Sequence, residues 1–355
     1  MKKVLLFFLL FFSIFTNCYA TTSTAEEYIL MDMTTGRIIQ GKNYNSPKLI
    51  ASITKIMTCL LAIESKKLDN IVVVDDEIKK AYGSGIYIEV GEEISLRNLL
   101  YGLMLRSGND AALMVAKYVG GSVDHFVEMM NQKAKDIGMK NTLFHNPSGL
   151  DNSDQGNYST AYDMAILTKY AMQYKEYQTI VKTKKHTVKT NKKTYIWHNK
   201  NKLLSTSYIT GGKTGYTEKA KRTLVSTASK NNMDFIVVTL KDSDDWNTHK
   251  SLYQYAFENY AAYRVLKKNR FQIIGEKNYS KKGRLYIKKD IYIPLKKEEL
   301  GTLMAKITLK EQKKLKNKSK VGEYSIYLNN QFLYKTNIYF QKKKTNVGTL
   351  RKSGF

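Results

Sequence analysis

The chain has 355 residues, a length typical of two or three domains, and carries 58 Lys and Arg against 31 Asp and Glu, for a formal net charge of +27. Its 43% apolar content excludes a disordered chain, and three prolines exclude a collagen-like or proline-rich linker protein. Two cysteines cannot form a disulfide scaffold, and five scattered histidines lack metal-ligand spacing, so no metal site is predicted.

The first 20 residues have the features of a secretory signal peptide. Two lysines form a charged start, residues 4–16 are an apolar run of 13, and Cys18 and Ala20 offer small side chains at the cleavage positions. A membrane anchor needs about 20 apolar residues, so this run is short for one, and Asn17 is a poor residue before a lipidated cysteine. We predict cleavage after Ala20, which removes two lysines and lowers the net charge to +25.

Export decides which partners the positive charge can meet. It removes nucleic acid as the natural partner and leaves lipid headgroups and cell-wall polymers as the polyanions outside the membrane. We expect the mature chain at the outer face of the cytoplasmic membrane or in the cell wall. Its single cysteine, Cys59, lies in an apolar helical stretch, which predicts a buried structural thiol.

The first part of the mature chain mixes strands and helices. Residues 28–32 and 37–40, separated by a Thr-Thr-Gly turn, predict an opening hairpin. Apolar residues at helical spacing predict a helix over 48–65. Further along, periodicity and turn signals predict helices at 96–104, 110–118, 123–137 and 160–174, a loop at 141–154, strands at 223–228 and 235–240, and a closing helix at 248–263.

The last quarter of the chain has a different texture. Residues 271–355 hold 21 Lys and Arg against 6 Asp and Glu, so +15 of the net charge lies there. Short alternating segments separated by lysine-rich turns predict a small all-β domain; they cover 285–294, 303–309, 322–328 and 331–340. The expected division of the chain is a signal peptide at 1–20, a larger domain at 21–268, a basic β-rich domain at 269–345 and a tail at 346–355.

Ser52 and Lys55 are the first candidate pair for chemistry. A spacing of three places both side chains on one helix face, within reach of each other. A serine hydroxyl is a weak nucleophile, and lysine can act as its base if burial and a second cation lower the lysine pKa by about 3 units. An ordinary helix start with an exposed lysine gives the same pattern, but among all serines of the chain this spacing occurs only here.

Two further triplets carry polar groups suited to a binding cleft. Ser107-Gly108-Asn109 lies between two predicted helices, where the serine can relay a proton and the asparagine amide can hold a carbonyl. An ordinary break between two helices, with a capping residue, gives the same sequence pattern, and residues 229–231 repeat it. Lys213-Thr214-Gly215 offers a cation and a hydroxyl for a carboxylate and a glycine for close backbone approach. A similar triplet at residues 352–354 is a decoy, because no predicted strand follows it.

The three motifs in this order, in an exported chain, resemble the penicillin-recognising serine enzymes, and among them the low-molecular-mass D-alanyl-D-alanine carboxypeptidases. The likeness runs from about residue 27 to 263, and its segment 213–229 looks like the sporulation-type branch. It implies an α/β, serine transpeptidase/β-lactamase-like catalytic domain, with an antiparallel sheet flanked by helices and a helical cluster. The basic β-rich end resembles that family's C-terminal domain more loosely.

The resemblance also implies a reaction. Ser52 would attack the carbonyl between the two terminal D-alanines of a peptidoglycan stem peptide, with Lys55 as its base. Backbone N–H groups of Ser52 and Tyr216 would hold the oxyanion, and Ser107 would pass a proton to the leaving D-alanine. Water would then hydrolyse the acyl-enzyme without a metal or organic cofactor. β-Lactam antibiotics should acylate Ser52.

Substrate binding is carried over in the same way. Asn109 would bind the peptide amide, and Lys213 and Thr214 would take the terminal carboxylate, with Lys213 helping to keep the base neutral. The chain departs from the family at Tyr216, where many members carry His. Residues 336–355 show no sustained amphipathic helix, so the C-terminal membrane anchor of many relatives is not predicted.

Two other functions compete with this one. A secreted β-lactamase shares the motifs, but class A enzymes usually carry Ser-Asp-Asn and a glutamate-directed water, and the loop 146–160 holds no glutamate. A non-catalytic basic wall-binding protein with a relict enzyme domain is disfavoured by the intact Ser52, Lys55, Ser107 and Lys213. The surplus charge predicts that the basic domain positions the enzyme against anionic wall polymer or lipid headgroups.

Overall fold

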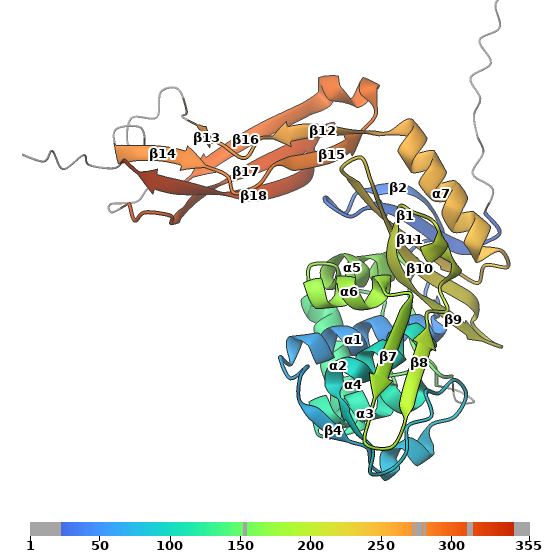
Figure 1. Ribbon diagram of the computed structural model, residues 1–355. Helices are drawn as coiled ribbons and strands as arrows, with labels where there is room; N and C mark the ends of the chain where they lie inside the picture. Colours follow the sequence, from blue (N-terminus) through green and yellow to red (C-terminus); the bar gives the residue numbers. More distant parts are fainter. Residues whose placement is uncertain are drawn as a thin grey trace, which may run out of the picture.

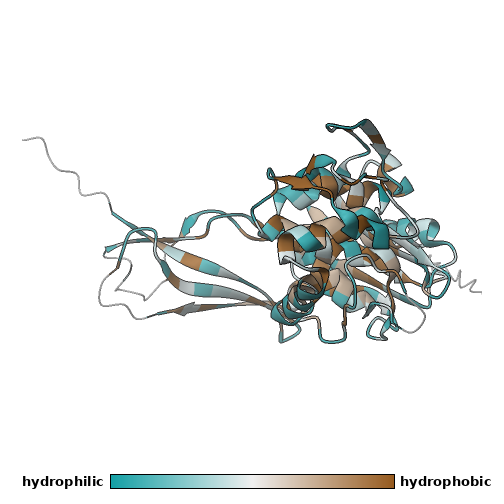
Figure 2. Ribbon diagram, turned by 90° about the horizontal axis from the view of Figure 1, so that it is seen from below, coloured by the Kyte–Doolittle hydropathy of each residue, from teal (hydrophilic) through white to brown (hydrophobic). Residues whose placement is uncertain are grey.

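The computed structural model describes residues 23–151, 155–271, 273, 279, 282–310 and 315–343. The expected signal peptide at 1–20, the tail at 346–355 and the decoy triplet lie outside the described residues. A larger unit of sheet and helices carries an elongated β-unit that projects from it (Figure 1). Many hydrophobic residues lie in the helices and sheet of the larger unit, whereas hydrophilic and hydrophobic residues are mixed along the strands of the β-unit (Figure 2).

A five-stranded antiparallel sheet forms the frame of the larger unit, in the order β2-β1-β11-β10-β9. Its strands are β1 (Glu27–Asp32), β2 (Ile38–Lys42), β9 (Ile209–Thr217), β10 (Lys221–Lys230) and β11 (Met233–Leu240). The hairpin predicted at the start of the chain is confirmed, but its strands lie beside β11 from far along the sequence. Strand β9 is the edge strand on which the Lys-Thr-Gly triplet lies.

The sequence of the central strand β11 is an almost continuous apolar run, and the position of the strand explains why. Side chains alternate across a strand, so Phe235 and Val237 enter one core, and Ile236 and Val238 enter the other. Helix α7 (Asp245–Asn259) covers the first face, and the helical cluster covers the second (Figure 1). A strand buried on both faces needs apolar residues at every position.

The helical cluster is built around α1 (Lys55–Glu64), which is buried along nearly its whole length and follows a 3₁₀ turn at Ala51–Thr54. Serine or threonine caps the N-terminal ends of three neighbouring helices by accepting a backbone N–H. The other helices are α2 (Leu96–Tyr101), a π-helical turn (Gly102–Arg106), α3 (Asn109–Gly120), α4 (Val123–Asp136), α5 (Ala161–Ala171) and α6 (Lys175–Lys182).

Short elements complete the larger unit. They are the strand pairs β3 (Lys48–Leu49) with β6 (Tyr158–Ser159), β4 (Ile71–Val73) with β5 (Glu93–Ser95), and β7 (Lys185–Lys189) with β8 (Thr194–His198), and the 3₁₀ turns Asp76–Lys80 and Lys202–Ser205. The β7–β8 hairpin and helix α6 were not predicted, because each is short: the two strands have five residues each and the helix has eight.

The end of the chain forms the predicted all-β unit. Strand β12 (Ala261–Leu266) pairs with β15 (Ile291–Leu295), and a 3₁₀ turn follows at Lys297–Thr302. A five-stranded sheet has the order β13 (Arg270–Phe271), β14 (Gly283–Tyr286), β18 (Gln331–Lys342), β17 (Lys320–Leu328) and β16 (Leu303–Leu309). The fold class predicted from the sequence is therefore confirmed.

Three element boundaries were wrong. The helix predicted over 48–65 loses its start, because Lys48–Leu49 pair with β6 before the chain turns into the helix. The closing helix over 248–263 ends at Asn259, because residue 261 already pairs with Leu295 in the β-unit. The segment 285–294 is not one strand: β14 and β15 lie in different sheets, separated by a turn.

A half-buried ion pair joins the two units. The guanidinium of Arg37, just before β2, contacts both carboxylate oxygens of Glu299, and Glu299 also accepts the backbone N–H of Lys296 at 2.8 Å. Arg37 and Lys296 lie 5.8 and 5.5 Å from the ring centre of Tyr260, the residue after α7. Bidentate geometry fixes orientation as well as distance, so the pair restricts how the units move.

We predict that Glu299→Gln loosens this junction. The uncharged amide leaves the Arg37 guanidinium without its counter-charge, which should lower the free energy of unfolding by about 1–3 kcal/mol. Limited proteolysis between α7 and β12, together with denaturant unfolding, measures the effect. The matched control is Glu298→Gln, an exposed neighbour. Equal stability and equal cleavage of the two variants would show that the ion pair contributes nothing.

Candidate active site

A pocket of about 350 Å³ opens where edge strand β9 meets the helical cluster. Its lining combines hydroxyls, two cations, a carboxylate and two aromatic side chains: Ser52, Ser84, Ser107, Lys200, Thr214, Gly215, Tyr216, Arg222, Asp245 and Trp246. Residues from all three sequence motifs therefore meet at one place, although more than 150 residues separate the first motif from the last.

Ser52 and Lys55 lie at the entrance to the central helix. The 3₁₀ turn before α1 presents the serine hydroxyl, and Lys55 Nζ lies 3.0 Å from Ser52 Oγ, as the spacing predicts. Lys55 is completely buried. Its Nζ also contacts Asn109 Oδ1 at 2.7 Å and the Ser148 carbonyl oxygen at 2.6 Å. These three hydrogen-bond partners of the amine are all uncharged oxygens.

The electrostatic surroundings disfavour a charge on Lys55. Burial is the largest cause that holds its pKa well below the usual range, and the nearby cations Lys213 and Lys200 lower it further. Asp110 acts in the opposite direction with a smaller effect. Its carboxylate is already engaged, because it accepts the backbone N–H groups of Ile86 and Tyr87. This balance favours the neutral form of the amine beside Ser52.

The Ser-Gly-Asn triplet occupies the predicted break between helices. The π-helical turn ends at Ser107, whose φ of 66° and ψ of 35° place it in the left-handed region. Its Oγ lies 3.1 Å from Lys213 Nζ. Asn109 begins α3 and is held through its backbone N–H, which Ser84 O accepts at 2.8 Å, while its Nδ2 donates to Tyr82 O at 2.6 Å.

The Lys-Thr-Gly triplet lies within strand β9. Lys213 is buried, and burial, followed by the charge of Lys200, lowers its pKa to about 7. A Cβ atom on Gly215 would lie 2.9 Å from the backbone nitrogen of Ser52, so only glycine lets this strand approach. The side chain of Tyr216 is 56% exposed and its hydroxyl donates to Glu218 at 2.9 Å.

Residues 146–149 and Asn157 close the site next to Lys55, although they were not predicted to belong to the site. Ser148 supplies a carbonyl oxygen to Lys55, and Asn157 links Thr54 Oγ1 at 3.0 Å to the Asn146 carbonyl oxygen at 2.8 Å. Ser148 lies in the loop predicted at 141–154, but a backbone carbonyl leaves no residue-type signal in the sequence. Lys200 was missed because a lone lysine in a lysine-rich chain has no distinguishing pattern.

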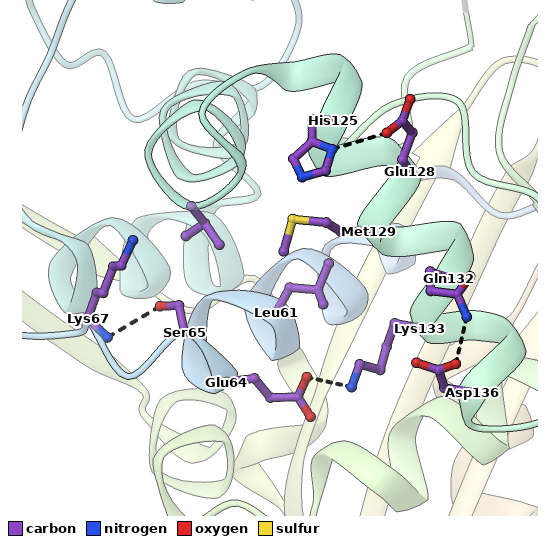
Figure 3. A pocket seen from close by; sticks show the side chains of 11 residues that line it. Leu61, Glu64, Ser65, Lys67, His125, Glu128, Met129, Gln132, Lys133 and Asp136 are labelled. Carbon is purple, nitrogen blue, oxygen red and sulfur yellow. Dashed lines mark hydrogen bonds and ion pairs between the residues drawn. The ribbon is translucent and has the colours of Figure 1, made fainter.

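A second pocket, of about 640 Å³, lies between the C-terminal half of α1 and helix α4 (Figure 3). Two pairs of its side chains interact: Glu64 with Lys133 at 2.8 Å, and His125 with Glu128 at 3.0 Å. None of the motif residues lines it. Within the described residues no group of His, Cys, Asp or Glu could hold a metal ion, and no helix is long and apolar enough to cross a membrane.

The fold and the pocket define a serine hydrolase domain of the penicillin-recognising type. The chain belongs to the D-alanyl-D-alanine carboxypeptidase family: the sequence model of that family matches residues 15–244, and that of the penicillin-binding protein 5 C-terminal domain matches residues 262–345. It is thus a serine-type D-Ala-D-Ala carboxypeptidase of the low-molecular-mass penicillin-binding proteins, as expected from the three motifs.

Individual relatives agree with this assignment. D-alanyl-D-alanine carboxypeptidase DacF of Bacillus subtilis is 33% identical over 318 residues, covering 79% of this chain and 81% of the relative. The crystal structures of penicillin-binding protein 5 from Haemophilus influenzae are similar with a TM-score of 0.72 at 28% identity, covering 91% and 98% of the two chains. DacD from Francisella tularensis gives 0.66 at 27% identity, covering 90% and 94%. Neither competing function gains support.

We predict that Gly149→Ala damages the pocket far more than Gly138→Ala. Both glycines have left-handed backbones, but an added Cβ meets the Ala51 carbonyl oxygen at 1.9 Å in the first and nothing within 4 Å in the second. Gly138→Ala should cost about 1–2 kcal/mol of unfolding free energy, and Gly149→Ala about 3 or more.

Gly149→Ala should also slow acylation by penicillin, because the neighbouring Ser148 carbonyl must move away from Lys55. Denaturant unfolding and the rate of labelling by fluorescent penicillin measure the two effects. Equal losses of stability in the two variants, with unchanged labelling, would mean that the contact with Ala51 is unimportant.

Proposed function

We propose that Ser52 is the nucleophile of this carboxypeptidase and that Lys55 is the base that activates it. One observation carries the proposal: a completely buried amine lies 3.0 Å from a serine hydroxyl that lines the pocket. A lysine can take a proton only in its neutral form, and burial favours that form.

The acceptors around Lys55 set the direction of its lone pair. A neutral amine has two N–H groups and one lone pair, and the oxygens of Asn109 and Ser148 accept both N–H groups. The lone pair then faces the Ser52 hydroxyl. During attack, Ser52 Oγ bonds to the carbonyl carbon of the D-Ala-D-Ala peptide bond while its proton moves to Lys55 Nζ.

Ser107 is proposed to complete the first half of the reaction. Its hydroxyl lies in the pocket beside Lys213, so it can give its proton to the nitrogen of the leaving D-alanine and take up the proton that Lys55 received from Ser52, which leaves Lys55 neutral for the second half. The backbone N–H groups of Ser52 and Tyr216 are proposed to hold the oxyanion. The close approach of Gly215 to the Ser52 nitrogen supports this. Water then hydrolyses the ester and returns a proton to Ser52.

The terminal carboxylate and the peptide amide have separate binding groups in this proposal. Lys213 and Thr214 take the carboxylate, and a bound anion favours the charged form of Lys213, whose pKa is otherwise about 7. Asn109 donates one Nδ2 hydrogen to Tyr82 O, which leaves the second for a substrate carbonyl. β-Lactams, which resemble the D-Ala-D-Ala end, take the same place.

We predict that Ser52→Ala abolishes covalent labelling by fluorescent penicillin and release of D-alanine from a stem pentapeptide. The alanine retains the helix start but removes the only atom that forms the ester. Ser205→Ala, an exposed serine outside the pocket, is the matched control and should label and hydrolyse like the wild type. Labelling that survives in Ser52→Ala would place the nucleophile elsewhere.

We also propose that the chain is exported and acts outside the cytoplasmic membrane. The support is the signal-like sequence of residues 1–20 and the location of peptidoglycan, the substrate of the family. The likeness of residues 213–229 to the sporulation-type branch supports a role in peptidoglycan made during sporulation.

The basic β-unit is proposed to hold the enzyme against anionic lipid or wall polymer. Residues 271–355 carry +15, and the lysines on β16 and on the turn before β17 are exposed. Such charges attract an anionic surface over about a Debye length. None of the described residues in this part of the chain lines the catalytic pocket.

We predict that the full-length mature chain binds vesicles containing phosphatidylglycerol and that added salt weakens the binding. Replacing Lys306, Lys310 and Lys318 together with Gln should weaken it by roughly 1 kcal/mol for each lysine near the surface. Vesicle sedimentation at several salt concentrations measures it.

The control replaces three exposed lysines of the larger unit, Lys66, Lys135 and Lys140, with Gln and therefore has the same net charge. If both triple variants bind alike, or if binding ignores salt, the β-unit is not the anionic-surface site.

A further inference from the structure

A third lysine lines the pocket, near the two buried lysines that the proposed mechanism uses. Lys200 follows strand β8 and lines the pocket together with Ser52 and Thr214. Its Nζ donates to Ser84 Oγ at 3.3 Å. Ser84 in turn accepts the backbone N–H of Asn109 through its carbonyl oxygen at 2.8 Å. Lys200 therefore touches the loop that holds one end of Asn109, without contacting Lys55 itself.

The backbone around Lys200 is fixed from both sides. The Lys200 N–H donates to the Leu105 carbonyl oxygen at 3.1 Å, in the π-helical turn before Ser107. Asn199 donates through Nδ2 to Thr183 O at 3.0 Å, and Asn201 caps the following 3₁₀ turn. Because the backbone of Lys200 is anchored on both sides, its side chain places the positive charge in a defined part of the pocket.

The charges that face this region come from several elements. Lys55 lies on α1, Lys213 on β9, Arg106 on the π-helical turn, and Asp110 on α3. Arg222 and Asp245 line the other end of the pocket and pair with each other at 2.5 Å. Asp110 is held by backbone N–H groups. Within the described part of the chain, Lys200 forms no ion pair with a carboxylate, so its charge is not cancelled locally.

We propose that Lys200 is a positioning residue whose positive charge keeps Lys55 in the unprotonated form that activates Ser52. The inference rests on the proposed role of Lys55 as base. A cation in a partly desolvated pocket repels a second charge several ångströms away, and this repulsion is stronger than in water. Lys200 is among the causes that lower the pKa of both Lys55 and Lys213, after burial in each case.

Removing the charge should move the pH profile in a defined direction. Without Lys200, Lys55 and Lys213 both hold a proton more tightly, so both pKa values rise. The acid limb of kcat/KM, which reports loss of the neutral base, then moves to higher pH. The alkaline limb, which reports loss of the Lys213 cation, moves the same way. A mere packing defect lowers the rate at every pH and leaves the limbs in place.

The experiment measures D-alanine release from a stem pentapeptide by full-length mature protein across a range of pH. In Lys200→Gln we expect the acid limb to shift upward by about 0.5 to 1 pH unit. Lys200→Arg retains the charge and should leave the limb within about 0.2 unit of the wild type. Lys202→Gln, an exposed lysine two residues further along, is the matched control and should not shift it.

Two results overturn the proposal. One is a uniform loss of rate in Lys200→Gln with unmoved limbs; the other is a shift that Lys200→Arg shares. Ser84→Ala separates the charge from the hydrogen bond: it removes the contact but not the cation, and should leave the acid limb in place. The proposed function fails separately, because it is judged by penicillin labelling of Ser52→Ala, which does not involve Lys200.

Discussion

The burial of one amine organises this molecule. Lys55 Nζ lies inside the helical cluster with only uncharged oxygens as partners, from a hydroxyl, an amide and a backbone carbonyl. Placing those three oxygens requires three segments that lie far apart in sequence. The fully buried α1 carries the lysine, α3 carries Asn109, and the turn at residues 146–149 brings a carbonyl beneath them. The central sheet then closes the site through its edge strand.

Much of this arrangement could be predicted from residue patterns. The helical periodicity of α1 and the strictly spaced Ser52 and Lys55 fix their relation within a single turn. Local spacing therefore carries real geometric information. The three motifs could be brought together only through resemblance to a family, because no local rule states that β9 lies against the start of α1. Register between distant strands, such as Tyr28 opposite Thr239, depends on the whole core.

What escaped prediction has a common physical origin. The carbonyl of Ser148 acts through the backbone, so its residue type says nothing about its role. Lys200 is proposed to act through distance and desolvation, which appear only once the chain is folded. Helix boundaries failed where tertiary pairing overrides helical periodicity, as at Lys48–Leu49, where two residues join β6. The residue type determines which chemistry a side chain can perform, and the fold determines which side chains are placed where they can perform it.

The left-handed backbones at the pocket carry a consequence for how this sequence can change. Ala51 and Ser107 both have positive φ, 48° and 66°, although neither is a glycine. Each such residue costs about 1–2 kcal/mol relative to an unstrained one; Ala51 precedes the proposed nucleophile, and Ser107 is itself the proposed proton relay. Glycine would relieve the strain at either position, but at 107 it would delete the hydroxyl. Selection for thermostability and selection for turnover therefore oppose each other at Ser107, and a more stable variant obtained there would be a slower enzyme.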